Sequence, residues 1–228
     1  MSVTDQAPWL TALDEEALRN RSRADVVFET VRDAIWTGRI AGGERVREED
    51  VARNLGVSRT PVREALQRLQ QRGLLTIGSR GLIVSQLSTS QVLELYAVRE
   101  VLEGSAARLA AQHANDIEIS ILHRLQRELE RVEEDANAVV MLNRRFHQAI
   151  YDAAHNQYLT QMLDVLHDSL ALLNNTTFRA PKRKETDKEH RKIVLAIEKH
   201  DPDQAELAAR QHIRNAQQTR FEERAVEL

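Results

Sequence analysis

The sequence predicts a mainly α-helical protein in which one short β-hairpin separates two helical regions. Glycine (8) and proline (4) are scarce in a chain of 228 residues, and good helix formers are abundant. Apolar residues recur at steps of three and four along most of the chain, which is typical of amphipathic helices. Only residues 74–86, "LLTIGSRGLIVSQ", show the pattern of two short strands around a turn.

Residues 21–86 predict a winged helix-turn-helix, preceded by a loose arm at residues 1–20. The apolar positions from Val26 to Ile35 mark a first helix, which a glycine-rich segment ends. A second, short helix is expected at residues 48–54, with Gly56 in the turn that follows it. A third helix and the hairpin complete the order of elements that this fold requires.

The third helix carries a basic face that predicts DNA binding. Ser58 is a good N-cap for this helix, and Gly73 ends it. Arg59, Arg63 and Gln67 are spaced four residues apart, so they share one helix face. Arginine forks suit phosphates and the O6/N7 edge of guanine. Such a face alone is often only solvated surface, but here turn, helix and wing occur together.

The charge distribution supports the same interpretation. Residues 51–86 contain six arginines and one glutamate, although the whole chain has a formal net charge of −3. A local basic segment in a nearly neutral protein favours contact with a polyanion at that segment. We therefore predict as DNA-binding residues Ser58, Arg59, Thr60, Arg63, Gln67 and Arg80.

From residue 89 to residue 222 the pattern predicts an all-helical antiparallel bundle of about six helices. The expected helices cover residues 89–113, 116–135, 137–155, 157–178, 183–200 and 203–222. The breaks between them are short, which favours antiparallel neighbours.

Three histidines lie on apolar stripes of different bundle helices. They are His147, His190 and His212, and Asn143 stands one turn before His147. Neutral imidazoles inside a helical bundle suit a borderline divalent cation such as Zn²⁺ or Ni²⁺. A single histidine on such a stripe is more often a packed core residue, so the residues alone leave both interpretations open.

Arg99 lies on the apolar stripe of the first bundle helix. A buried arginine requires an anion or a dense set of acceptors. Glu103, one turn later, is one candidate partner, and an anionic effector is the other. A cavity that holds a cation and an arginine favours an anion.

The N-terminal motif "LGVSRTPVREALQRLQQRGLL", preceded by "VREEDVA", resembles the DNA-binding domain of the GntR family of bacterial transcription regulators. The resemblance implies that Ser58, Arg59 and Arg63 enter the major groove. It also implies that wing residues such as Ser79, Arg80 and Gly81 reach the minor groove. Some members carry a further DNA-contacting arginine early in the second helix, where this chain has Glu49, so that contact is expected to be absent.

The bundle resembles the FCD ligand-sensing domain of the FadR-like branch of that family. The motifs that carry the resemblance are "YAVREVLEGSAARLAA", "NRRFHQAIYDAAHNQYL", "EHRKIVLAIEKHDPDQA" and "AARQHIRNA". In metal-binding members the ligands are an acid and three histidines. Carried over residue by residue, this implies Asn143, His147, His190 and His212, with Asn143 where aspartate is more usual. The resemblance also implies a small organic acid as effector, whose carboxylate meets the metal or Arg99.

These features predict a ligand-responsive DNA-binding regulator, with repression as the expected sign, that binds a palindromic operator as a homodimer. One alternative is a constitutive DNA-binding dimer whose bundle only dimerises it. A metal-dependent hydrolase is disfavoured, because no Asp or Glu accompanies the histidines on an inward stripe and no HExxH motif occurs. We therefore expect no enzymatic activity. The chain has no cysteine and no apolar run long enough for a membrane span, which favours the cytoplasm and no membrane partner.

Overall fold

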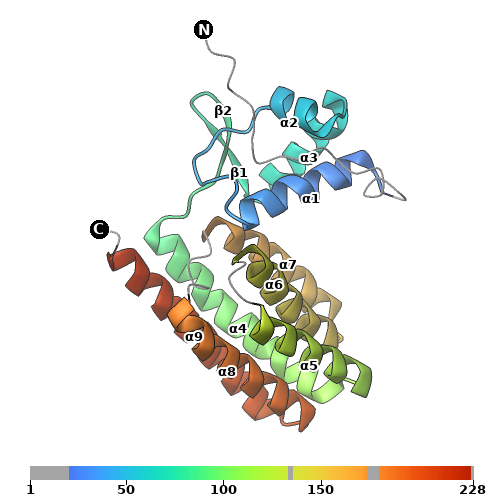
Figure 1. Ribbon diagram of the computed structural model, residues 1–228, viewed down its shortest axis with the longest axis vertical. Helices are drawn as coiled ribbons and strands as arrows, with labels where there is room; N and C mark the ends of the chain where they lie inside the picture. Colours follow the sequence, from blue (N-terminus) through green and yellow to red (C-terminus); the bar gives the residue numbers. More distant parts are fainter. Residues whose placement is uncertain (1–20, 133–135, 174–179, 227–228) are drawn as a thin grey trace. The chain divides into compact units, whose positions relative to one another are not determined.

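The computed structural model describes residues 21–132, 136–173 and 180–226 (Figure 1). The arm expected at residues 1–20 lies outside this range. The described residues form two compact units. The first runs up to Leu87 and includes a segment that begins at His167, and the second begins at Ser88 and resumes after that segment.

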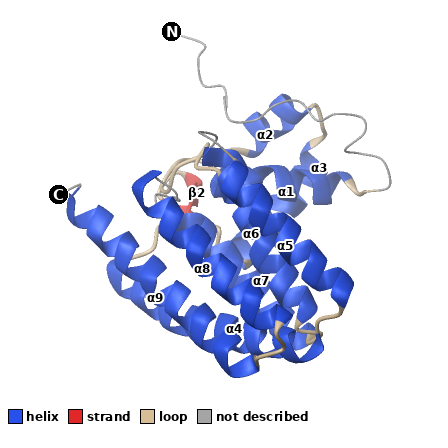
Figure 2. Cartoon of the chain, turned by 60° about the horizontal axis from the view of Figure 1, so that its bottom comes forward, coloured by secondary structure: helices blue, strands red, loops and turns tan. Residues whose placement is uncertain are grey.

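The first unit contains three helices and a two-stranded hairpin, as predicted. They are α1 (Arg23–Trp36), α2 (Glu48–Leu55), α3 (Arg59–Gln71), β1 (Leu75–Gly78) and β2 (Gly81–Val84). The strands, of which Figure 2 shows β2 in red, pair antiparallel in the register Leu75↔Val84 to Gly78↔Gly81. This register leaves Ser79 and Arg80 as the two residues of the wing turn. The prediction of a mainly α fold with a winged helix-turn-helix is confirmed.

The turn between α2 and α3 depends on the conformation of Gly56. Its φ of 66° and ψ of 30° are left-handed, a region that glycine adopts without the steric cost of a Cβ. Ser58 occupies the N-cap position of α3 in extended conformation, but its side chain makes no capping hydrogen bond. The position was therefore predicted correctly, whereas the capping interaction is not formed. The Ser58 hydroxyl is left exposed at the helix N-terminus.

The second unit is the predicted helical bundle. Its helices are α4 (Thr89–His113), α5 (Asp116–Arg131), α6 (Ala136–Ala153), α7 (Gln157–Leu170), α8 (Ala180–Glu198) and α9 (Pro202–Val226). Four expected helix ends, at residues 135, 155, 178 and 200, lie beyond the observed ones, and the last helix runs past its expected end at residue 222. Of these stretches, residues 133–135 and 174–178 lie outside the described part of the chain. Helix α5 ends at Arg131 because Val132 turns to extended backbone. Helix α7 ends at Leu170 and continues as the 3-10 turn Ala171–Leu173.

Local capping and small side chains explain how α4 and α5 start and pack. Ser88 with Gln91, and Asn115 with Glu118, form reciprocal capping boxes that satisfy the first N–H groups of each helix. Helix α9 packs along α4 and α8, and the three ribbons run side by side in Figure 1. Helix α4 contributes mostly alanines to the core, which lets neighbouring backbones approach closely.

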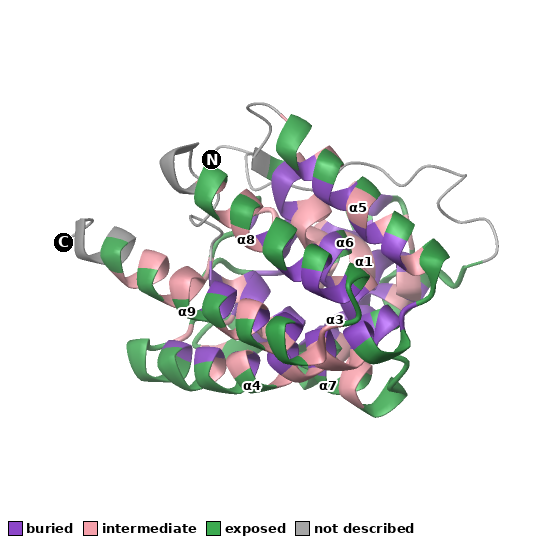
Figure 3. Ribbon diagram, turned by 90° about the horizontal axis from the view of Figure 1, so that it is seen from below, coloured by how far each residue is buried: buried purple, intermediate pink, exposed green. Residues whose placement is uncertain are grey.

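The core of the bundle lies on the inward stripes of its helices. Figure 3 shows buried residues on one side of each helix and exposed residues on the other. Apolar residues spaced three and four positions apart lie on one side of a helix, which explains this arrangement. Within the described part of the chain, no helix combines the length and apolar character that crossing a membrane demands.

Leu122→Ala should lower the free energy of unfolding by about 2–5 kcal/mol, because it removes a buried side chain and leaves a cavity. Leu122 lies on α5, has no exposed surface and belongs to the bundle core. Ile117→Ala on the same helix is the matched control, since Ile117 is 74% exposed and its loss should change stability by under about 0.5 kcal/mol. Urea unfolding followed by circular dichroism measures both. Equal effects would contradict this assignment of the core.

Candidate functional site

The eight residues predicted to bind DNA are all exposed in the first unit. Ser58 precedes α3, and Arg59 and Thr60 open its first turn. Arg63 and Gln67 follow on the exposed face of the same helix, whose other face is buried at Val62, Leu66 and Leu69. Ser79, Arg80 and Gly81 lie at the wing turn. The structure thus makes these side chains accessible, and their contact with DNA remains a prediction.

Arg59 and Arg63, the two arginines on the exposed face of α3, are both ion-paired with one carboxylate of α2. Glu48 accepts hydrogen bonds from Nε and Nη2 of Arg63, at 3.3 and 3.1 Å, and from Nη2 of Arg59 at 3.3 Å. The hydrogen bond from Arg63 is the largest cause that lowers the pKa of Glu48, against the opposing effect of burial. Glu49 also pairs with Arg59, at 2.9 Å. Sequence reasoning missed this arrangement, which fixes where the two guanidinium groups lie.

One arginine of the basic segment packs within the first unit and is not part of the exposed face of α3. Nη1 of Arg68 donates to Asp25 on α1 at 2.7 Å, and its guanidinium lies 4.6 Å from the ring centroid of Phe28. Arg68 therefore holds α3 to α1 through an ion pair and a cation–π contact.

Arg45 is exposed and forms a β-bridge with Ile83, which places it beside the wing. Only tertiary pairing reveals Arg45 as a candidate DNA contact.

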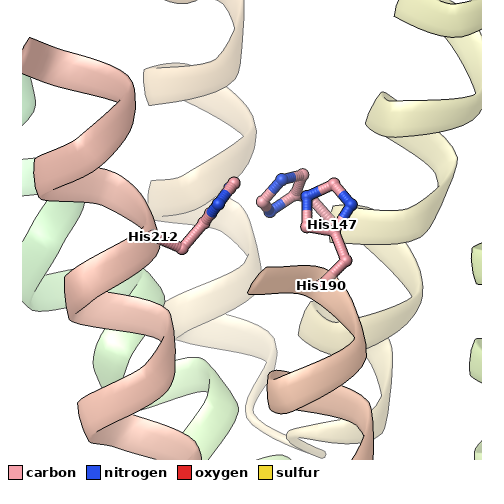
Figure 4. Close-up of side chains that lie close together, drawn as sticks. All are labelled: His147, His190 and His212. Atoms are coloured by element: carbon pink, nitrogen blue, oxygen red, sulfur yellow. The ribbon is translucent and has the colours of Figure 1, made fainter. Parts of the chain in front are cut away.

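The three predicted histidines converge inside the bundle. His147 on α6, His190 on α8 and His212 on α9 point toward one another (Figure 4). Their exposed fractions are 2%, 1% and 4%, and one ligand atom from each lies within 4.8 Å of the others. Asn143 is on α6, one turn before His147, and its Oδ1 is buried. The structure therefore brings together the three histidines that the sequence indicated, as a cluster that could hold a metal ion.

Carboxylates from two helices orient two of the rings. Nδ1 of His147 lies 2.8 Å from Oε2 of Glu103 on α4, and Nδ1 of His212 lies 2.8 Å from Oε2 of Glu189 on α8. Each pair takes up Nδ1 and so leaves Nε2 as the ring nitrogen that can accept a metal ion. The ring of Phe146 packs against His190 in a tilted arrangement, with the centroids 4.4 Å apart and an interplanar angle of 32°. His190 is thus positioned by packing.

Burial favours the neutral imidazole at His147 and His190. Burial is the largest cause that lowers the pKa of His190 well below its usual value, and the neighbouring His212 and His147 lower it further. Burial also lowers the pKa of His147, although the carboxylate of Glu103 opposes this. A neutral imidazole offers the lone pair that metal binding requires. The electrostatics therefore favour coordination over an imidazolium cluster.

Arg99 is buried and paired with Glu103, the partner that the sequence left open. Nε of Arg99 donates to Oε1 of Glu103, and its guanidinium lies 5.5 Å from the ring centroid of Tyr96. The expectation that no acid accompanies the histidines is wrong, because Glu103 and Glu189 both contact them. Glu103 lies on a different helix from His147, and Glu189 precedes His190 but contacts His212. Inspection of each histidine's own stripe misses such contacts.

Comparison with known proteins places both units in one family. Residues 23–83 match the bacterial regulatory proteins of the gntR family, and residues 94–215, more than half of the chain, match the FCD domain. The chain belongs to the GntR family. The resemblance that the sequence motifs indicated is thereby confirmed for both the winged helix-turn-helix and the bundle.

The relatives of this GntR-family chain are transcription regulators, and the alignments cover most of the length of each relative. The Probable D-xylose utilization operon transcriptional repressor of Paenarthrobacter nicotinovorans is 32% identical, over 87% of this chain and 90% of the relative. The Glc operon transcriptional activator of Escherichia coli (strain K12) is 30% identical, over 85% and 87%. The structure of E. coli McbR/YncC has a TM-score of 0.81 at 22% identity, covering 89% of this chain and 99% of that chain. It shows the shared fold.

Proposed function

We propose that this GntR-family regulator is a repressor whose affinity for its operator is set by a small organic acid sensed at a metal centre in the bundle. The observation that carries the proposal is the cluster of three buried imidazoles with ligand atoms within 4.8 Å of one another. The same chain carries a winged helix-turn-helix with an exposed basic face. One molecule therefore combines a surface for DNA with a buried site for a ligand.

The residues of the cluster fit a divalent cation. Oδ1 of Asn143 and both ring nitrogens of His190 are buried and have no hydrogen-bond partner. Each unsatisfied buried group costs about 1–3 kcal/mol, and coordination of a cation would remove that cost. We assign as metal ligands Asn143, His147, His190 and His212. Nitrogen and amide-oxygen donors of this kind suit Zn²⁺ or Ni²⁺.

The effector is proposed to be an organic acid because of the charges around the site. A bound divalent cation would supply positive charge for the acid's carboxylate. Arg99 is the proposed second contact, through the Nη groups, since Glu103 engages its Nε. Both contacts require an anion. An uncharged ligand would give the cation no anionic partner.

A homodimer would let two winged helices read the two half-sites of a palindrome. Helix α7 supports an interface with a second copy, because Tyr158, Met162 and Val165 lie on one face and are 69%, 60% and 55% exposed. Effector binding would bias the packing of the bundle, with a coupling free energy of about 1–3 kcal/mol. The relative named as a repressor supports repression, while the relative named as an activator makes the sign a point for experiment.

Fluorescence anisotropy with a DNA duplex selected from a random pool tests this function. Protein loaded with Zn²⁺ or Ni²⁺ should bind the duplex as a dimer, and one member of a panel of small carboxylic acids should weaken binding about 5- to 150-fold. Metal-free protein should lose this response. A chain that is monomeric at micromolar concentration would contradict the homodimer. Equal DNA binding with every acid and without metal would contradict effector sensing and leave a constitutive DNA-binding protein.

A further inference from the structure

The carboxylate of Glu103 occupies an unusual position for an acidic side chain. It lies on α4, it is 3% exposed, and it contacts three groups from two helices. Oε1 accepts from Arg99, Oε2 lies 2.8 Å from Nδ1 of His147, and the hydroxyl of Tyr151 also hydrogen-bonds to this carboxylate. A carboxylate removed from water to this extent needs strong partners to remain charged. The guanidinium of Arg99, itself buried, is such a partner.

We propose that Glu103 is a positioning residue of the metal centre, which holds the proton of His147 on Nδ1 and supplies the negative charge that Asn143 lacks. This inference rests on the metal centre proposed above. An ionised carboxylate can only accept hydrogen bonds. The Nδ1 atom of His147 must therefore carry the proton, and Nε2 keeps its lone pair for a ligand.

The charge of the ligand set gives Glu103 its second effect. The imidazoles of His147, His190 and His212 and the amide of Asn143 carry no negative charge. A carboxylate hydrogen-bonded to the far side of a ligating imidazole makes that ring a stronger donor and places a negative charge one ring away from the cation. Arg99, which is ion-paired with Glu103, offsets part of this charge. Glu189 acts on His212 in the same way, but it is less buried and shares its carboxylate with Asn215.

The metal affinity of the Glu103→Gln variant tests this role, because glutamine has nearly the shape of glutamate but carries no negative charge. The dissociation constants for Zn²⁺ and Ni²⁺, measured by competition with a chromophoric chelator, should rise about 10- to 100-fold over wild type. Glu100→Gln is the matched control, because Glu100 lies on the same helix and makes the same kind of ion pair with Arg214 at the surface. Its dissociation constants should equal those of wild type.

A second measurement separates positioning from packing. Long-range ¹H–¹⁵N spectra of metal-free wild-type protein should show the His147 ring proton on Nδ1 alone, and in Glu103→Gln the proton should redistribute between the nitrogens. A purely structural role would change stability without moving that proton. Wild-type protein that takes up no metal would overturn the proposed function as well. Wild-type protein that binds metal, with Glu103→Gln binding as tightly or with the wild-type proton on Nε2, would overturn this inference alone.

Discussion

Arg63→Ala should weaken binding to the selected operator duplex by about 1–3 kcal/mol for each half-site, because it removes a guanidinium fork from the face of α3 that we predict to read the DNA. Arg63 is 57% exposed at its side chain, so its loss leaves the core of the first unit intact. Binding to a scrambled duplex should fall much less, since phosphate attraction from the other basic residues persists. Anisotropy titrations at several salt concentrations measure both quantities.

Two further variants sharpen this test. Arg63→Lys keeps the charge but loses the planar fork, so it should retain the salt dependence of wild type while discriminating less between operator and scrambled duplex. Arg214→Ala removes one arginine of similar exposure, 53%, from the bundle and should leave DNA affinity unchanged. Operator binding by Arg63→Ala equal to that of wild type at every salt concentration would refute the assignment of α3 as the reading helix.

His190→Leu should abolish high-affinity metal binding. Structural zinc sites in small peptides bind with about 10–16 kcal/mol, so one of four ligands accounts for about 2.5–4 kcal/mol, or on the order of 10²–10³-fold in affinity. Neither ring nitrogen of His190 has a hydrogen-bond partner, so leucine removes two unsatisfied polar atoms. The metal-free variant should therefore unfold with a free energy equal to or above that of metal-free wild type.

Elemental analysis and chemical unfolding in the presence of a chelator provide the two measurements. His123→Ala is the control, because His123 lies on α5, outside the cluster, and pairs with Glu198 at 3.4 Å. It should bind metal like wild type. A structural core histidine would give the opposite pattern, in which His190→Leu destabilises the metal-free protein and leaves metal uptake unchanged. That result would remove the metal centre from the proposed function.

Structural elements that depend on nearby residues in the sequence were predicted well. The periodicity of apolar residues located the bundle helices, and Gly56 and the Gly78–Gly81 turn located the bends of the first unit. Helix ends were less accurate, as at Arg131 and Leu170, because neighbouring packing decides where a helix stops. The Ser58 capping bond was not formed although the N-cap position was correct.

The partners of the polar side chains depended on the arrangement of helices. The stripes on which His147, His190 and His212 lie are visible in the sequence, because each stripe is a property of one helix. The contact of Glu103 with His147 joins α4 to α6, and that of Glu189 with His212 joins α8 to α9. Such pairings depend on the rotation and register of one helix against another, which no single periodicity contains.

The sequence by itself determined the family, the two-part architecture, the basic face of α3 and the inward stripes that carry His147, His190 and His212. All of these follow from local spacing and from motifs. The tertiary structure decided that Arg99 pairs with Glu103, that Glu48 holds Arg59 and Arg63, and that carboxylates orient two of the imidazoles. Most of these contacts join residues on different helices, and the Arg99–Glu103 pair is a pair of buried charges. The energy of a buried charge depends on every group packed around it.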